Sequence, residues 1–220
     1  GPWFFLDREV YVQFSGALQQ EIKGRAILVD RLQRSILGNS GKRDFTLSTI
    51  VAMLHVPLRG KAVIDAGAGD AMLSLVAAKR GARPLILIEQ DTVRLQQACI
   101  NLALNGLVEG RDFYLLNLDL RNLRAILRNL SRIVLPQEIV LISDIGTFTR
   151  EYTVTNQDSL ALIPYLPRIS WVVLGGYFIW RGCHSLAMEQ DIRYIRERGL
   201  GLRVDPYLAR FAGSEWSVAA

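Results

Sequence analysis

From residue 61 onward, stretches typical of β-strands alternate with stretches typical of α-helices, and this alternation limits the folds open to the chain. The strand-like stretches are nearly continuous apolar runs, as in LILI at 85–88 and IVLI at 139–142. Such runs are typical of parallel strands that helices cover on both faces. Because crossovers between parallel strands are right-handed, we expect an α/β fold with a doubly wound, mainly parallel sheet of seven strands.

The two ends of the chain are expected to differ from this regular alternation. Residues 200–220 read as two strands joined by a turn, and the last strand would pair antiparallel with the sheet. Residues 3–14 mix aromatic and β-branched side chains, as in a short strand or a docking arm. We therefore predict an N-terminal extension at 1–56, in which Gly1 and Pro2 resemble the remnant of a cleaved tag, and one main domain at 57–220.

The composition excludes several other classes of protein. Half of the residues are hydrophobic, which suits a folded domain with a buried core. No apolar run reaches the roughly 18 to 20 residues of a membrane span, and no secretory leader pattern is seen, so we expect a cytoplasmic protein without a membrane partner. Cys99 and Cys183 are too few for a disulfide framework, and with only two histidines we expect no metal site.

The segment VIDAGAGDAMLS, at 63–74, joins the first expected strand to its helix through a glycine-containing turn. Gly67 and Gly69 allow backbone conformations, and a close approach of a ligand, that a side chain would prevent. In doubly wound sheets ligands bind beyond the carboxyl ends of the strands, next to helix N-termini. A single G-x-G remains a weak indication of a ligand, because any tight strand-to-helix turn can use it.

Acidic residues stand at the ends of four consecutive expected strands, and their carboxylates would meet at one edge of the sheet. These acids are Asp65, Glu89, Asp119 and Asp144. An acid at Glu89, 22 residues beyond Gly67, is placed to accept hydrogen bonds from both ribose hydroxyls of an adenosine. An acid at Asp119 is placed to accept one from the adenine amino group. The pattern therefore favours a nucleoside-containing ligand.

These segments resemble the successive motifs of class I S-adenosylmethionine-dependent methyltransferases. The motifs are VIDAGAGDAMLSLVAAKRGA, LILIEQD, LLNLDLRNL and IVLISDIG, and the closing SEWSVAA resembles the family's last antiparallel strand. The resemblance covers roughly residues 43–220. FTLSTIVAML before the glycine turn and NLALNG after it are most similar to the ribosomal protein L11 methyltransferase-like group. The resemblance implies a Rossmann-like fold, S-adenosylmethionine as the cofactor and methyl transfer as the reaction.

The resemblance also implies a role for individual residues. Those it places around the cofactor are Asp65, Gly67 and Gly69 at the methionine portion, Glu89 and Gln90 at the ribose, Leu118 and Asp119 at the adenine, and Asp144 at the rim where donor and acceptor meet. Methyl transfer from a sulfonium mainly requires that the acceptor be positioned, and in some cases deprotonated. Candidates for a general base near the rim are Asp144, Thr147 and Tyr152.

The sequence departs from the family on the acceptor side. SDIGTF, at 143–148, stands where enzymes that methylate exocyclic amines of nucleic acids carry Asn or Asp, two prolines and an aromatic, so we find no DNA-methylating pattern. A protein side chain and an RNA are both favoured over a small metabolite as the acceptor, and the sequence does not choose between them. It does not indicate an oligomeric state either. The alternative is a non-catalytic binding or scaffold protein that retains the fold.

Two other nucleotide-binding classes fit less well. A dinucleotide-dependent dehydrogenase would carry a third small residue in G-x-G-x-x-G, and Met72 occupies that position. No P-loop motif occurs in the chain. The third glycine of the methyltransferase turn is replaced by Ala71, which is a small change.

Overall fold

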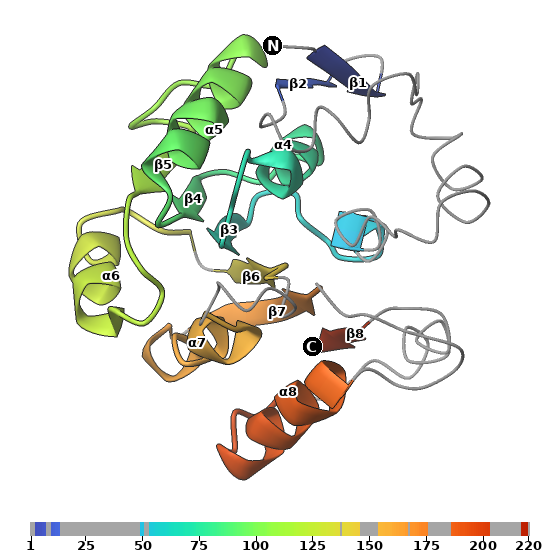
Figure 1. The fold of residues 1–220 in the computed structure, drawn as a ribbon, viewed down its shortest axis with the longest axis vertical. Helices are drawn as coiled ribbons and strands as arrows, with labels where there is room; N and C mark the ends of the chain where they lie inside the picture. Colours follow the sequence, from blue (N-terminus) through green and yellow to red (C-terminus); the bar gives the residue numbers. More distant parts are fainter. Residues whose placement is uncertain are drawn as a thin grey trace.

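The computed structural model describes residues 3–7, 10–13, 49–50, 53–136, 138–145, 154–166, 168–175, 186–202 and 217–219. Its main sheet has six strands in the order β5-β4-β3-β6-β7-β8 (Figure 1). The strands are β3 (Ala62–Ala66), β4 (Leu85–Ile88), β5 (Phe113–Leu116), β6 (Ile139–Ser143), β7 (Ile169–Leu174) and β8 (Ser217–Ala219).

The order of the strands makes this a doubly wound sheet. The chain runs from β3 outward through β4 to β5, then returns to place β6 on the other side of β3 and β7 beyond it. The five strands β3 to β7 pair in parallel, and β8 pairs antiparallel with β7. The expected α/β class with a parallel, Rossmann-like sheet is confirmed. The described residues form six strands of this sheet, whereas seven were expected. Of the two strands expected within 200–220 only the last is seen, and residues 203–216 lie outside the described part of the chain.

Helices cover both faces of the sheet. On one face lie α4 (Met72–Lys79) and α5 (Thr92–Leu104); on the other lie α6 (Leu123–Leu130), α7 (Asn156–Leu160), a 3-10 turn (Ile163–Tyr165) and α8 (Leu186–Glu197) (Figure 1). Successive strand residues point to opposite faces. In β3, Val63 therefore packs in the core cluster with α4 and α5, whereas Ile64 packs in the cluster with α6 and α7. This double burial explains the continuous apolar runs.

The N-terminal part of the described chain forms a small separate sheet. Strands β1 (Trp3–Asp7) and β2 (Val10–Gln13) pair antiparallel with each other. Further along, Met53 and Val56 are buried in the same core cluster as Val63. The end of the expected extension therefore contributes to the core of the sheet domain, and the division at residue 56 stays a prediction. Within the described part of the chain, no helix combines the length and the apolar character needed to cross a membrane.

Candidate functional site

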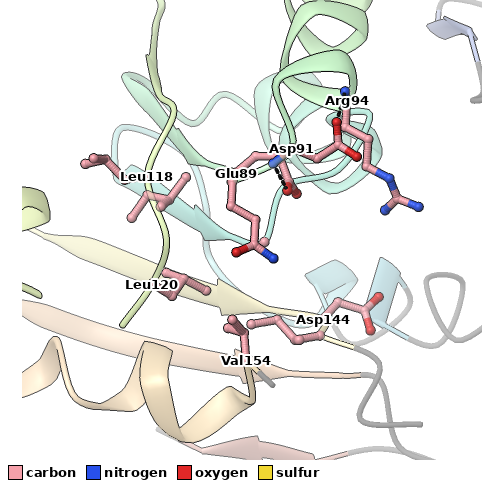
Figure 2. A pocket seen from close by; sticks show the side chains of 11 residues that line it. Glu89, Asp91, Arg94, Leu118, Leu120, Asp144 and Val154 are labelled. Carbon is pink, nitrogen blue, oxygen red and sulfur yellow. Dashed lines mark hydrogen bonds between the residues drawn. The ribbon is translucent and has the colours of Figure 1, made fainter. Parts of the chain in front are cut away.

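A pocket opens at the carboxyl ends of the strands, where the direction of winding reverses between β3 and β6 (Figure 2). Its volume is about 260 Å³. The residues that line it are Gly67, Ile88, Glu89, Gln90, Asp91, Arg94, Leu118, Leu120, Asp144, Ile145 and Val154. They include five of the eight residues that the sequence assigned to a cofactor. Ligands of doubly wound sheets bind at this position.

The glycine turn between β3 and α4 is folded tightly against β4. The backbone N–H groups of Gly67 and Ala68 both donate to the carbonyl of Ile88, at 2.8 and 3.1 Å. Gly67 has φ +76°, and a Cβ atom there would lie 2.9 Å from Cγ1 of Ile145. Ala71, which replaces the family's third glycine, also adopts a left-handed conformation, with φ +70°. The turn thus keeps its backbone shape despite that change, although an alanine in this conformation costs roughly 1 to 2 kcal/mol.

We expect Gly67→Ala to lower both stability and ligand affinity. Strain at the positive φ costs roughly 1 kcal/mol, and the contact with Ile145 adds to it because the methyl group would enter the wall of the pocket. Gly106→Ala is the matched control, because Gly106 has the same φ of +76° but nothing within 4 Å of its Cβ position. Thermal unfolding should show a larger loss for Gly67→Ala, and equal losses would contradict the close approach.

Glu89 connects the glycine turn to the start of α5. The residue is only 9 % exposed, and its Oε2 accepts a hydrogen bond from the backbone N–H of Gly69 at 2.9 Å. Its Oε1 accepts from the N–H of Asp91, also at 2.9 Å. A carboxylate oxygen has two acceptor sites, so each oxygen retains one for a ligand hydroxyl. Glu89 therefore orders the turn and still faces the pocket, beside Gln90.

Asp65 lies in β3, is 1 % exposed and is not among the residues that line the pocket. Its Oδ2 accepts a hydrogen bond from Oγ of Ser74 in α4, at 2.6 Å. Its Oδ1 has no hydrogen-bond partner among the described residues. Burial raises the pKa of Asp65 to about 6, and the nearby Glu89 adds to the rise, although the hydrogen bonds from Ser74 oppose it. A buried carboxylate oxygen without a partner is rare in folded proteins and is typical of a binding site.

The carboxylate of Asp119 is engaged by a neighbour. It accepts hydrogen bonds from the backbone N–H and from Nε of Arg121, both at 2.9 Å, and this pairing lowers the pKa of Asp119. Asp119 does not line the pocket, whereas Leu118 and Leu120 do. The predicted contact of Asp119 with an adenine stays a prediction.

Asp144 follows β6 directly and lines the pocket, as its place in the sequence predicted. The end of β7 comes very close to it: a Cβ atom on Gly175 would lie 2.7 Å from Oδ1 of Asp144 and would overlap Oγ1 of Thr49. Gly175 is thus required for the close approach of three segments at this rim. The other two candidates for a general base, Thr147 and Tyr152, lie outside the described residues.

A buried polar network behind this rim was not predicted from the sequence. Its side chains are Ser143 in β6, Asn156 and Ser159 in α7 and Asp191 in α8. Asn156 accepts from Oγ of Ser143 at 2.8 Å and donates to the carbonyl of Gly175 at 3.0 Å and to Oδ2 of Asp191 at 3.1 Å. The network fixes the ends of β6 and β7 against the helices. Because its members are far apart in the sequence, no local pattern indicates it.

Comparison with known proteins identifies relatives of the region that carries the pocket. The family described as ribosomal protein L11 methyltransferase (PrmA) matches residues 39–147. Over 66 residues, the chain is 36 % identical to the ribosomal protein L11 methyltransferase of Phocaeicola vulgatus. That match covers 30 % of this chain and 24 % of the relative, so it spans about a quarter of that relative's length.

Solved structures share the fold over most of the chain. One is the ribosomal protein L11 methylase from Lactobacillus delbrueckii subsp. bulgaricus, with 18 % identity, a TM-score of 0.51 and coverage of 82 % of this chain and 79 % of that one. Another is a putative SAM-dependent methyltransferase from Streptococcus mutans, with 16 % identity, a TM-score of 0.53 and coverage of 82 % and 49 %. At such identities the likeness shows the fold alone.

Proposed function

We propose that this chain binds S-adenosylmethionine in the pocket at the carboxyl ends of β3 and β6 and catalyses transfer of its methyl group. The chain is related to the ribosomal protein L11 methyltransferase group of class I methyltransferases. The main observation in support of this proposal is that the glycine turn lies next to a buried acid. A Cβ atom on Gly67 would meet Ile145, and Oδ1 of Asp65 is buried without a partner behind the turn.

The residues present fit the chemical parts of this cofactor. Glu89 keeps an acceptor site on each oxygen for the two ribose hydroxyls, with Gln90 beside it. Leu118, Leu120 and Ile88 offer an apolar wall for the adenine ring. The orphaned oxygen of Asp65 would accept from the α-ammonium group at the methionine end. S-adenosylmethionine supplies a sulfonium-bound methyl group, which an acceptor takes by in-line displacement.

The chain contributes to this reaction chiefly by orientation. The glycine turn and Glu89 would hold the ribose, and Asp144 lines the part of the pocket where an acceptor would approach the methyl group. The polar network around Asn156 keeps that rim in place, because it ties the ends of β6 and β7 to α7 and α8. Asp144, Thr147 and Tyr152 remain our candidates for holding or accepting a proton of the acceptor.

We further propose a protein side chain as the acceptor, with RNA as the second candidate. The support is that the relatives are named as methyltransferases of ribosomal protein L11. The match covers only about a quarter of the length of these relatives. Transfer of a radiolabelled methyl group to a ribosomal protein fraction and to an RNA fraction, measured in parallel, distinguishes the two acceptors. A chain that binds the cofactor but labels neither would favour the scaffold alternative.

Thermal unfolding with S-adenosylhomocysteine, and with NAD in parallel, tests the cofactor assignment. A ligand present at about 100 times its dissociation constant stabilises the folded state by roughly 2.7 kcal/mol. For a chain of this length that corresponds to a rise in Tm of roughly 5 to 10 °C. We expect the rise with S-adenosylhomocysteine and no change with NAD. No rise with either ligand would leave the fold intact but contradict the proposed function.

A further inference from the structure

We infer that Arg94, in the first turn of α5, is the residue that binds the α-carboxylate at the amino-acid end of the cofactor. This inference rests on the proposed function, because it assigns a further residue to that same pocket. It concerns a side chain that neither the sequence motifs nor the comparisons single out.

The charges that line the pocket are unequal. Among the described lining residues, Glu89, Asp91 and Asp144 are acidic and Arg94 is the only basic one. Glu89 accepts two backbone N–H groups, and Asp91 accepts the N–H groups of Val93 and Arg94 as the N-cap of α5. The guanidinium group of Arg94 has no hydrogen bond or ion pair within the described part of the chain. It is therefore available to an anionic group of a ligand.

The guanidinium group lies at one particular end of the pocket. Figure 2 shows it on the same side as the carboxylate of Asp144, with Leu118 at the opposite side. Its Nη1 lies 3.7 Å from the Cβ position of Gly69, so it extends over the glycine turn. The apolar side suits the adenine, which leaves the charged side for the amino-acid end of the ligand. The capping of α5 by Asp91 fixes the point from which the arginine side chain extends.

The amino-acid end of S-adenosylmethionine carries a carboxylate, an ammonium group and the nearby sulfonium. The two cationic groups suit the acids of the pocket, whereas the carboxylate requires a cation. A guanidinium group presents two parallel N–H donors that match the two oxygens of a carboxylate. Arg94 is the described lining residue with that chemistry.

The test compares two ligands that differ at this end. S-adenosylhomocysteine carries the amino-acid group, and 5′-methylthioadenosine has the same nucleoside and thioether sulfur without it. Calorimetric titration of Arg94→Met should show an affinity for S-adenosylhomocysteine lowered about 10- to 100-fold, the range for hydrogen bonds between charged groups. The affinity for 5′-methylthioadenosine should stay unchanged. The affinity of Arg94→Lys for S-adenosylhomocysteine should lie between those of Arg94→Met and the wild type, because lysine keeps the charge but lacks the two parallel N–H donors.

Arg128→Met is the matched control, because Arg128 is exposed on α6 and does not line the pocket. Unchanged binding of S-adenosylhomocysteine by Arg94→Met would overturn the inference and leave the proposed function standing. An equal loss for both ligands would also overturn it, since it would place Arg94 at the nucleoside or show a distorted pocket. A wild type that binds neither ligand would overturn the proposed function together with this inference.

Discussion

Replacing Asp65 by asparagine is expected to stabilise the ligand-free protein at neutral pH and to weaken its binding of S-adenosylhomocysteine. Burial raises the pKa of Asp65 from 3.8 to about 6 in the folded protein. The folded state therefore binds this proton more tightly than the unfolded state, and stability falls as the pH rises from about 4 through 6. At 1.36 kcal/mol per pKa unit, the ionised carboxylate costs about 3 kcal/mol above that range.

Asparagine removes this titration but adds an amide N–H₂ group that needs an acceptor, at a cost of about 1 kcal/mol. The net gain of Asp65→Asn should therefore be about 2 kcal/mol at pH 8, or roughly 4 to 8 °C in Tm. It should disappear between about pH 4 and pH 5 and turn into a loss of about 1 kcal/mol at lower pH, where only the cost of the amide remains. Affinity for S-adenosylhomocysteine should fall at least about tenfold, because the ligand's ammonium group loses a charged acceptor. Thermal unfolding across pH and calorimetric titration measure the two effects.

Asp112→Asn provides a control of opposite sign. Hydrogen bonds from Arg111 and from the backbone of Val108 lower the pKa of Asp112, so its ionised form stabilises the folded state. That variant should be less stable than the wild type at neutral pH, and the difference should shrink as the pH falls below the usual aspartate range. If Asp65→Asn behaved in the same direction as Asp112→Asn, Asp65 would not be a buried, uncompensated acid.

Much of the fold could be predicted because the sheet is buried on both faces. LILI at 85–88 and IVLI at 139–142 each became a strand with every residue buried, and the amphipathic stretch after Asn122 became α6. Helix boundaries were less predictable. Helix α6, for example, begins only at Leu123, because the side chain of Asn122 caps its N-terminus. Such capping contacts depend on backbone geometry, which the spacing of apolar residues in the sequence does not predict.

The site could be predicted where it depends on strand ends and not where it depends on contacts between distant segments. Gly67, Glu89 and Asp144 follow the ends of β3, β4 and β6, which are neighbours in the sheet, and parallel pairing brings them to one pocket. The role of Asn156 could not be predicted, since its hydrogen-bond partners lie 11 to 35 residues away in the sequence. The place of Arg94 at the pocket could not be predicted either, because an arginine in the first turn of a helix usually faces solvent.

Glu89 has two roles in the structure that the sequence could not distinguish. The motif suggested a carboxylate that binds ribose, and the structure adds that both oxygens already accept backbone N–H groups, from Gly69 and Asp91. A residue with both roles joins the shape of the turn to recognition of the ligand. Its replacement should therefore affect the free energy of unfolding as well as the affinity.

We expect Glu89→Ala to lower the free energy of unfolding by roughly 2 to 6 kcal/mol, because two N–H groups lose their acceptor at about 1 to 3 kcal/mol each. The affinity for S-adenosylhomocysteine should fall by about 1.5 to 3 kcal/mol. Glu89→Gln should have an intermediate effect, since its amide keeps one acceptor oxygen but turns a donor toward the other N–H group. Glu197→Ala, at the exposed end of α8, should change neither quantity.

The ribose contact itself is isolated by a ligand without the hydroxyls. Wild-type protein should bind 5′-methylthioadenosine more tightly than its 2′,3′-dideoxy analogue, whereas Glu89→Ala should bind the two alike, because the acceptor of those hydroxyls is gone. If the preference for the hydroxyls survived in Glu89→Ala, Glu89 would order the turn without touching the ribose. Its two hydrogen bonds to Gly69 and Asp91 would then account for all of its effect on the pocket.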